Sequence, residues 1–275
     1  MNILGIDVGG SGIKGAPVDL TLGDFAEARV RIPTPAKSSP KNVAAVVAEI
    51  IENFKEQIPA GSRIGLTVPA PVVHGRVPFM ANLHKSWAGF EAATFFEDRL
   101  GRPVTLVNDA DAAGLAEVHY GAAKGNDGLV IMTTLGTGIG SAIIHRGVLV
   151  PNAELGHVEL DGFDAETRAA SSIKEKEKLS YKEWAVRLQR YYSHIEMLFS
   201  PDLFVVGGGV SKDSEKFLPL LQLHTPIVPA KMRNRAGIIG AALAAQDANL
   251  HPVTSKLVEP GREERATRVE TPDAR

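Results

Sequence analysis

The stretch NILGIDVGGSGIKGAPVDL, residues 2–20, indicates the fold. Residues 2–8 read as a buried strand, and a glycine-rich turn follows at 9–12. The segment behind the turn alternates in polarity and contains Pro17, so it reads as a second strand. The pattern G-x-G-x-x-G at residues 10–15 therefore lacks the helix that a dinucleotide-binding fold requires there. We expect a hairpin whose tip either makes a plain tight turn or presents backbone N–H groups to phosphate.

Two later stretches repeat this arrangement of an apolar strand and a glycine turn. LGTGIG at 135–140 lies between strands predicted at 129–135 and 139–150, and GGGVS at 207–211 follows a predicted strand. Ser211 is a suitable N-cap for a helix that would begin there. Three such turns favour a cleft that holds a phosphate chain from two sides. Asp7 would hold a hydrated Mg²⁺ and Lys14 would add a positive charge.

The rest of the pattern predicts an α/β protein in two blocks. Three strands (2–8, 13–20 and 25–32) form an expected antiparallel meander, and helix, strand, helix and strand follow at 41–57, 63–68, 90–100 and 103–107. The second block has helices predicted at 110–119, 180–199 and 238–248. Ser180 and Glu183 match a capping box. Residues 250–275, rich in Pro, Glu and Arg, are expected to be disordered.

Composition narrows the class of function. Of the 275 residues 44% are hydrophobic, and the net charge of −2 argues against general nucleic-acid binding. The chain has no cysteine, which excludes disulfides, thiol catalysis and thiolate metal sites. The start has no basic region before a long apolar run, and no stretch approaches the roughly 20 apolar residues of a membrane span. We expect a cytoplasmic protein that binds no membrane.

Polar residues near predicted strand ends are candidates for a sugar site. Asn108 and Asp109 follow a strand, where the local pattern favours a helix cap for Asp109. Glu154 and His157 lie in the loop segment ELGH. Together with Asn82, these side chains offer donors and acceptors suited to a polyol. No G-x-S-x-G or H-E-x-x-H motif is present, so neither a serine hydrolase nor a catalytic metal held by protein alone is expected.

The motifs, in this order, resemble those of the ROK sugar kinases in the actin/hexokinase-like ATPase superfamily. They are DVGGSGIKG at 7–15, ND at 108–109, LGTGIG at 135–140, ELGH at 154–157 and GGGVS at 207–211. The match runs from residue 2 to about residue 245. Segments at 81–87, 175–191, 198–212 and 233–243 resemble a subgroup of polyphosphate-using glucokinases from actinobacteria. The combination is specific to the family, whereas each piece alone is not.

The resemblance implies a fold of two ribonuclease-H-like lobes around a central cleft. A small lobe over 1–108 would be completed by a C-terminal helix at 236–249, and a large lobe over 109–235 would carry a homodimer surface. It also implies phosphoryl transfer from polyphosphate or ATP to the 6-hydroxyl of glucose, with Asp109 as general base. The implied sugar contacts are Asn82, Asn108, Asp109, Glu154, His157 and Glu166. The implied donor site comprises Gly9, Gly10, Ser11, Gly12, Lys14, Gly136, Thr137, Gly138, Gly207, Gly208 and Gly209, with Mg²⁺ held through water by Asp7.

The chain departs from the family pattern in two places. Many members have a cysteine-rich zinc motif after the histidine of E-x-G-H, whereas residues 158–172 contain no cysteine, so no structural zinc is expected. Ala70 stands where the family has a glycine beside the sugar. Basic residues at 174–190 and 231–235 resemble a path for a polyanion, although the interleaved glutamates alone favour an ordinary solvated helix face.

Three other functions remain open. A strictly ATP-dependent kinase would act on glucose, mannose or an N-acetylated hexosamine with the same polar set. A sugar-responsive repressor would carry a DNA-binding domain ahead of the first strand, yet that strand begins at residue 2. A catalytically silent sugar-binding protein would have no use for Asp109 and three donor loops. The chain is therefore interpreted as a sugar kinase.

Overall fold

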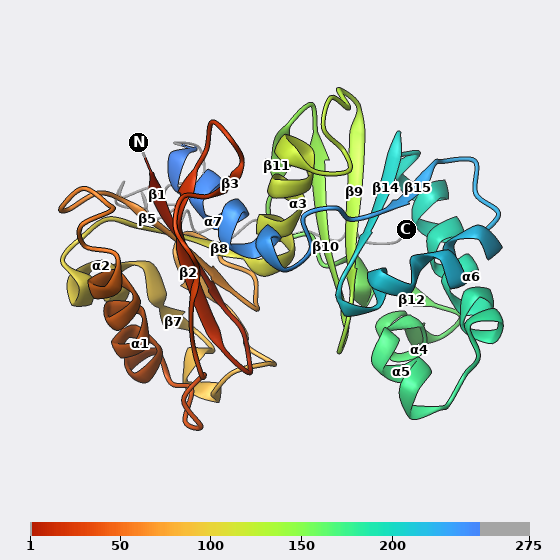
Figure 1. Ribbon diagram of the computed structural model, residues 1–275. Helices are drawn as coiled ribbons and strands as arrows, with labels where there is room; N and C mark the ends of the chain where they lie inside the picture. The colour runs from red at the N-terminus through yellow and green to blue at the C-terminus, as the bar shows by residue number, and fades with distance from the viewer. Residues whose placement is uncertain (1, 248–275) are drawn as a thin grey trace, which may run out of the picture.

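The computed structural model describes residues 2–247, which fold into two lobes built on two mixed sheets (Figure 1). The first-lobe sheet has the order β3-β2-β1-β5-β8, and β4 also pairs with β2. Its strands are β1 (Ile3–Val8), β2 (Ile13–Asp19), β3 (Asp24–Phe25), β4 (Val30–Ile32), β5 (Ile64–Val68) and β8 (Val104–Asn108). The second-lobe sheet has the order β11-β10-β9-β14-β15. Its strands are β9 (Leu129–Leu135), β10 (Ile139–His145), β11 (Val148–Val150), β14 (Leu203–Gly207) and β15 (Ile227–Pro229).

The two sheets share one topology. β1 pairs antiparallel with β2 and parallel with β5, which pairs parallel with β8. In the same way β9 pairs antiparallel with β10 and parallel with β14, which pairs parallel with β15. The β1–β2 turn and the β9–β10 turn therefore occupy equivalent places in the two lobes. The sequence has no close repeat, so only the structure reveals this duplication.

The helices of the first lobe follow from local sequence. α1 (Pro40–Asn53) begins with proline, which the first helical turn tolerates, and buries Val43 and Ile50 on one stripe. α2 (Ala92–Leu100) ends at Gly101, whose left-handed φ of 63° suits glycine. The two helices pack against each other and share one hydrophobic core with the sheet. They leave the other face of that sheet for a helix from far along the chain.

The second lobe is covered by α6 (Tyr181–Phe199), which opens with the predicted capping box. Glu183 N donates to Ser180 Oγ at 3.2 Å, and Ser180 N donates to Glu183 Oε2 at 2.8 Å. The buried face of α6 packs through Tyr192 on Phe204 of β14. Smaller elements complete the fold: α4 (Glu166–Ala169), α5 (Ser171–Lys176), and the pairs β6 (Arg76–Val77) with β7 (Phe90–Glu91) and β12 (Glu159–Leu160) with β13 (Phe163–Asp164).

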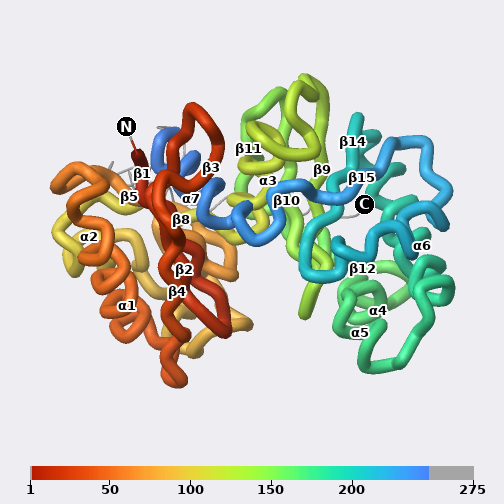
Figure 2. Tube along the Cα trace, viewed as in Figure 1, coloured from red at the N-terminus to blue at the C-terminus, as the bar shows by residue number. Residues whose placement is uncertain are grey.

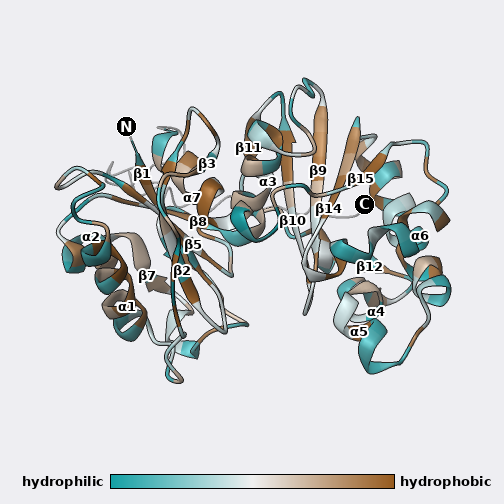
Figure 3. Cartoon of the chain, in the orientation of Figure 1, coloured by the Kyte–Doolittle hydropathy of each residue, from teal (hydrophilic) through white to brown (hydrophobic). Residues whose placement is uncertain are grey.

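Two helices, α3 (Asp109–Tyr120) and α7 (Ala236–Gln246), pack against each other between the sheets (Figure 1). α3 begins at the end of β8 and lies on β10 of the second lobe, whereas α7 lies on β1 and β5 of the first. A Cβ at Gly65 would stand 1.7 Å from the Ala241 carbonyl oxygen, so α7 approaches the sheet backbone to backbone. α7 is apolar and buried on nearly all sides (Figure 3). Figure 2 shows the first strand and α7 side by side, although they are far apart in the sequence.

The structure corrects three predicted elements. The third strand of the meander is two short strands, β3 and β4, which both pair with β2. The strand predicted over 139–150 is a hairpin, because Arg146 and Gly147 adopt left-handed φ values of 52° and 77°. Ser211 does not cap a helix: a 3₁₀ helix begins earlier, at Gly209, and the Ser211 hydroxyl donates to the Gly208 carbonyl at 2.8 Å.

Some predictions fall outside what the structure covers. The tail at 250–275 and the last residues of the helix predicted to extend to 249 lie beyond the described residues. The lobe limits of 1–108 and 109–235 stay predictions. Within residues 2–247, no helix has the length and apolar character needed to cross a membrane.

Candidate active site

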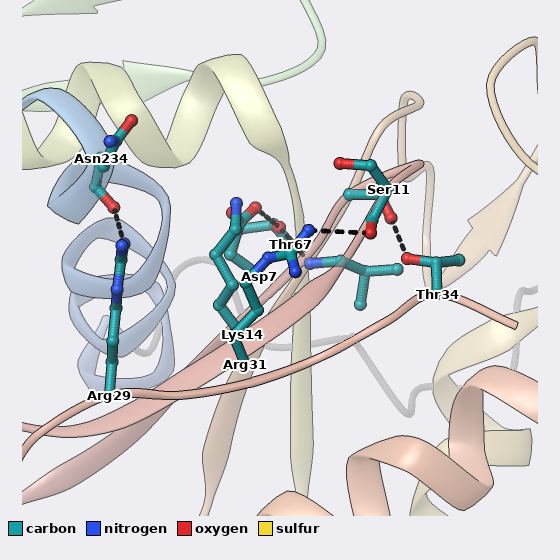
Figure 4. Close-up of polar contacts among 10 residues, drawn as sticks. Asp7, Ser11, Lys14, Arg29, Arg31, Thr34, Thr67 and Asn234 are labelled. Atoms are coloured by element: carbon teal, nitrogen blue, oxygen red, sulfur yellow. Dashed lines mark hydrogen bonds and ion pairs between the residues drawn. The ribbon is translucent and has the colours of Figure 1, made fainter.

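The β1–β2 turn is held in shape by side chains from β4 and the segment behind it. Gly9 N donates to the Gly12 carbonyl at 3.1 Å, which closes the turn. The Thr34 hydroxyl donates to the Gly9 carbonyl at 2.5 Å, and the Arg31 guanidinium donates to the Ser11 carbonyl at 3.0 Å (Figure 4). The turn therefore has a fixed shape before a ligand binds, which suits a loop that places backbone N–H groups around phosphate.

Asp7 lies in β1 directly before this turn. Its Oδ1 accepts a hydrogen bond from the Thr67 hydroxyl at 2.9 Å, and its Oδ2 pairs with Lys14 Nζ at 3.3 Å (Figure 4). A Cβ at Gly237 would lie 3.0 Å from the carboxylate carbon, so the Asp7 carboxylate stands against the first turn of α7. A helix N-terminus stabilises a nearby negative charge. The Asp7 carboxylate is therefore fixed in direction, and its side chain remains 20% exposed.

The two glycine turns of the second lobe lie side by side, because β9 and β14 are parallel neighbours. Gly208 has a φ of 84°, and a Cβ there would stand 2.2 Å from the Leu135 carbonyl oxygen. Ser172 of α5 holds the other turn: its N donates to the Gly136 carbonyl at 3.0 Å and its hydroxyl to the Thr137 carbonyl at 2.6 Å. Only glycine at position 208 allows the two turns to approach this closely. Both turns therefore lie together at the same end of the sheet.

Asn108, rather than Asp109, is the N-cap of α3. Asn108 caps α3, because its Oδ1 accepts from Ala110 N at 2.7 Å and from Asp111 N at 3.2 Å. The interpretation of Asp109 as a helix cap is therefore wrong. Asp109 is the first residue of α3. Its Oδ1 accepts from Ala110 N at 2.9 Å, and its side chain remains exposed.

Acidic residues of both lobes raise the pKa of Asp109. Burial is the main cause that raises its pKa to about 6, followed by the negative charge of Asp7 in β1 and, more weakly, that of Glu154 in the second lobe. The residue is nevertheless exposed by surface area, so it lies among protein atoms but remains open to a substrate. A carboxylate with a pKa near neutrality is suited to act as a general base.

The segment ELGH packs on β10 of the second lobe. Ser141 of β10 supports it by accepting a hydrogen bond from Leu155 N at 2.8 Å. His157 Nδ1 lies 2.8 Å from Asp164 Oδ2, and this hydrogen bond is the main cause that raises the pKa of His157. Burial raises the pKa of the Glu154 carboxyl, and the neighbouring His157 opposes that shift. The segment therefore presents an acid and a histidine on one supported turn.

Glu166 has a structural task that the sequence did not indicate. Its Oε2 accepts from Ile139 N at 3.0 Å and lies 2.2 Å from where a Cβ of Gly138 would stand. Glu166 thereby ties the β9–β10 turn to α4. Ligand atoms of His157, Asp164 and Glu166 lie within 4.8 Å of one another, a spacing that a metal ion could share. Both carboxylates are already engaged in the hydrogen bonds described, so these contacts account for the cluster.

The predicted sugar residues come from both lobes. Asn82 is exposed and adjoins the first turn, since its carbonyl oxygen lies 3.6 Å from the position of a Cβ on Gly10. Asp109 belongs to the helix that joins the lobes, and the ELGH segment and Glu166 belong to the second lobe. Sequence reasoning missed two acidic residues nearby, Asp111 and Asp164. No spacing rule links either of them to the motifs, so the sequence held no signal for them.

Most arginines of the predicted polyanion path are paired with acidic side chains. The pairs are Arg187–Glu177 at 2.5 Å, Arg190–Asp161 at 2.8 Å and Arg235–Asp24 at 2.7 Å. Lys174 of α5 instead lies over the Tyr181 ring, with Nζ 4.2 Å from the ring centroid. It shares its short helix with Ser172, which holds the β9–β10 turn. Lys174 is thus two residues from the serine that holds the β9–β10 turn, whereas these three arginines are engaged in ion pairs.

Comparison with known proteins assigns the chain to a family. A sequence model described as the ROK family matches residues 3–169. The chain belongs to the ROK family. It is 50% identical over 242 residues to polyphosphate glucokinase from Mycobacterium tuberculosis, a match that covers 88% of this chain and 90% of that protein.

Solved structures of ROK proteins share the fold. The inorganic polyphosphate/ATP-glucomannokinase from Arthrobacter sp. strain KM has a TM-score of 0.83 and 52% identity, and the match covers 89% of this chain and 98% of that one. The ROK hexokinase from Thermus thermophilus has a TM-score of 0.74 and 27% identity, with 88% and 97% covered. The predicted family and the two-lobed actin/hexokinase-like fold are thus confirmed. The roles of single site residues, the homodimer surface and the cytoplasmic location stay predictions.

Proposed function

We propose that this ROK protein transfers a phosphoryl group from inorganic polyphosphate to the 6-hydroxyl of glucose, giving glucose 6-phosphate. The observation that carries the proposal is Asp109, an exposed carboxylate whose pKa is raised by burial and by acidic residues of both lobes. The relatives supply the substrates, since one is a polyphosphate glucokinase and another a polyphosphate/ATP-glucomannokinase. ATP as a second donor and mannose as a second acceptor belong to the same proposal.

In the proposed reaction Asp109 accepts the proton of the sugar 6-hydroxyl while that oxygen bonds to the terminal phosphorus of the donor. The bond from this phosphorus to the bridging oxygen breaks, and the shortened polyphosphate leaves with the electron pair. Asp109 then releases its proton to solvent. General-base help of this kind contributes ~10²–10⁴-fold to the rate. The residues proposed to hold the sugar are Asn82, Asn108, Asp109, Glu154, His157 and Glu166.

Two of these sugar contacts are constrained by hydrogen bonds already made. Asn108 Oδ1 caps α3, so its amide nitrogen is the group proposed to donate to a sugar oxygen. Glu166 Oε2 accepts from Ile139 N, so its other carboxylate oxygen is the one proposed to face the sugar. A sugar that fits must therefore meet one donor from Asn108 and one acceptor from Glu166.

The proposed donor site consists of the three glycine turns, with Lys14 and Asp7 beside the first. Mg²⁺ bound to the donor phosphates would compensate the charge that develops during transfer. Asp7 fits a contact through water, because carboxylate oxygens suit Mg²⁺ whereas both of its own oxygens already accept from Thr67 and Lys14. Lys14 supplies a fixed positive charge on the same side of the turn.

A coupled assay of glucose and of mannose, each with ATP and with polyphosphate at two salt concentrations, tests the proposal. We expect glucose 6-phosphate to form with polyphosphate, and the apparent KM for polyphosphate to rise with salt, by analogy with counterion release from nucleic acids. Turnover with ATP alone would select a strictly ATP-dependent kinase. Sugar binding without turnover would select a non-catalytic regulator. Product from neither sugar with either donor would refute a hexokinase-type activity.

A further inference from the structure

The side chain of Asn152 connects the two lobes. Asn152 follows β11 of the second lobe and shortly precedes Glu154. Its Oδ1 accepts from Val72 N at 2.7 Å, and its Nδ2 donates to the Val72 carbonyl at 2.9 Å. Val72 lies in the first lobe, in the segment behind β5. One side-chain amide thus pairs with the donor and the acceptor of a single residue, as a neighbouring strand would.

Asp111 of α3 holds Asn152 in place. Its Oδ2 accepts from Asn152 N at 2.8 Å. Asn152 has a φ of 63°, a left-handed conformation that asparagine adopts more readily than most residues. The bond from Asp111 therefore fixes the backbone of the very residue whose side chain reaches across to the first lobe.

The burial of Asp111 is unfavourable for stability. The residue is only 1% exposed, and its Oδ1 has no hydrogen-bond partner among residues 2–247. An unpaired buried carboxylate lowers the free energy of unfolding relative to a neutral side chain in the same position. Its neighbours on α3, among them Ala112, Ala113 and Gly114, show that small apolar residues suit this helix. A buried carboxylate at this position therefore requires a reason other than core packing.

We propose that Asp111 and Asn152 are positioning residues that hold the sugar-contact segment of the second lobe in register with the first lobe. The inference rests on the kinase function proposed above. Asn152 lies two residues before Glu154, and Asp111 lies two residues after Asp109 in α3. The hydrogen-bonded chain from Asp111 through Asn152 to Val72 therefore ties the proposed base, a proposed sugar contact and the first lobe together.

The consequence is that the sugar meets a site that is already ordered. Without the link, binding of glucose would have to order the segment that carries Glu154, and part of the binding free energy would be lost. The donor site uses the glycine turns and not this segment, so the loss should fall on glucose and spare the phosphoryl donor.

The direct test is Asn152→Gly, which removes the amide without straining the left-handed backbone. We expect the KM for glucose to rise about tenfold, with the KM for polyphosphate and kcat each changing less than about threefold. The matched control is Asn126→Gly, which removes an amide that accepts from Gly128 N in a turn outside the site. That variant should retain the KM for glucose.

A second pair of variants tests Asp111. Asp111→Ala removes the acceptor for Asn152 N and should also raise the KM for glucose. Asp111→Asn keeps an oxygen at that place and should bring the KM for glucose back to within about threefold of the unmodified value. Thermal unfolding of each variant is recorded alongside, because a loss of folded protein alone lowers the maximal rate and leaves KM unchanged.

Several outcomes would overturn the inference. One is an unmodified KM for glucose in Asn152→Gly. Another is an equal rise in the KM for both substrates, or the same rise in Asn126→Gly, since either result indicates general structural loss. If the unmodified protein turns over no glucose with either donor, the proposed function fails and the inference fails with it, so the two failures are distinguishable.

Discussion

The raised pKa of Asp109 predicts how the activity depends on pH. Burial, and then the charges of Asp7 and Glu154, raise this pKa from 3.8 to about 6. With that value, roughly 97% of the molecules carry the ionised base at pH 7.5 and roughly 9% at pH 5. Because only the ionised carboxylate accepts the sugar proton, kcat/KM for glucose should fall about tenfold over that range, with a midpoint near pH 6.

The assay is a series of initial rates from pH 5 to 8 at limiting glucose and saturating polyphosphate. Asp109→Asn should lower kcat ~10²–10⁴-fold, while glucose binding measured by calorimetry survives. Asp111→Asn is the control, because burial raises the pKa of Asp111 to about 7, close to that of Asp109. A fall in rate at low pH that persists in this variant does not come from Asp111.

Two results would refute this reasoning. A rate that stays constant down to pH 5 in a protein that remains folded would mean that burial and the charges of Asp7 and Glu154 do not raise the pKa of Asp109. Near-normal turnover in Asp109→Asn would mean that Asp109 is not the base.

Three further predictions concern stability and are checked by urea unfolding. Gly65→Ala places a Cβ 1.7 Å from the Ala241 carbonyl oxygen, so α7 must shift and the free energy of unfolding should fall by ~1–3 kcal/mol. Ser180→Ala removes the capping box of α6 and should lower it by about 1 kcal/mol, and an unchanged midpoint would count against the cap. The pKa of Asp111 is about 7 in the folded protein and 3.8 as the ordinary value that applies in the unfolded chain. Between these pH values the folded state keeps a proton that the unfolded state has lost, so the free energy of unfolding falls as the pH rises. Asp111→Asn should remove up to about 3 kcal/mol of this fall between pH 5 and 8, and an equal fall in both proteins would contradict it.

Local patterns predicted those parts of the fold that local interactions decide. The first hairpin was predictable because Pro17 and alternating polarity exclude a helix behind the glycine turn. The start of α6 was predictable because a capping box involves only residues four positions apart or fewer. The short strands β3 and β4 were not separable, because the break between them depends on how each meets β2.

The sequence proposes candidate site residues but does not predict how the structure arranges them. Asn108 and Asp109 are adjacent and both suit a helix cap, so only the place where β8 ends decides which of them caps α3. The ion pair of Arg187 with Glu177 joins separate segments, so the sequence does not show that this positive charge is already paired and less available to a polyanion. The contact between Asn152 and Val72 crosses from one lobe to the other, so no local pattern marks it.

The return of α7 to the first lobe imposes an order on folding during synthesis. β1 and β5 leave the ribosome long before α7, and until it arrives the apolar surface around Gly5 and Gly65 has no cover. The second lobe, with its own sheet and α6, is translated in between, and the described residues of the core cluster under α6 include none from α7. The lobe that is made first is therefore completed last. Synthesis that stops before residue 236 would release a chain with an open apolar face, a substrate for chaperones and proteases rather than half of an enzyme.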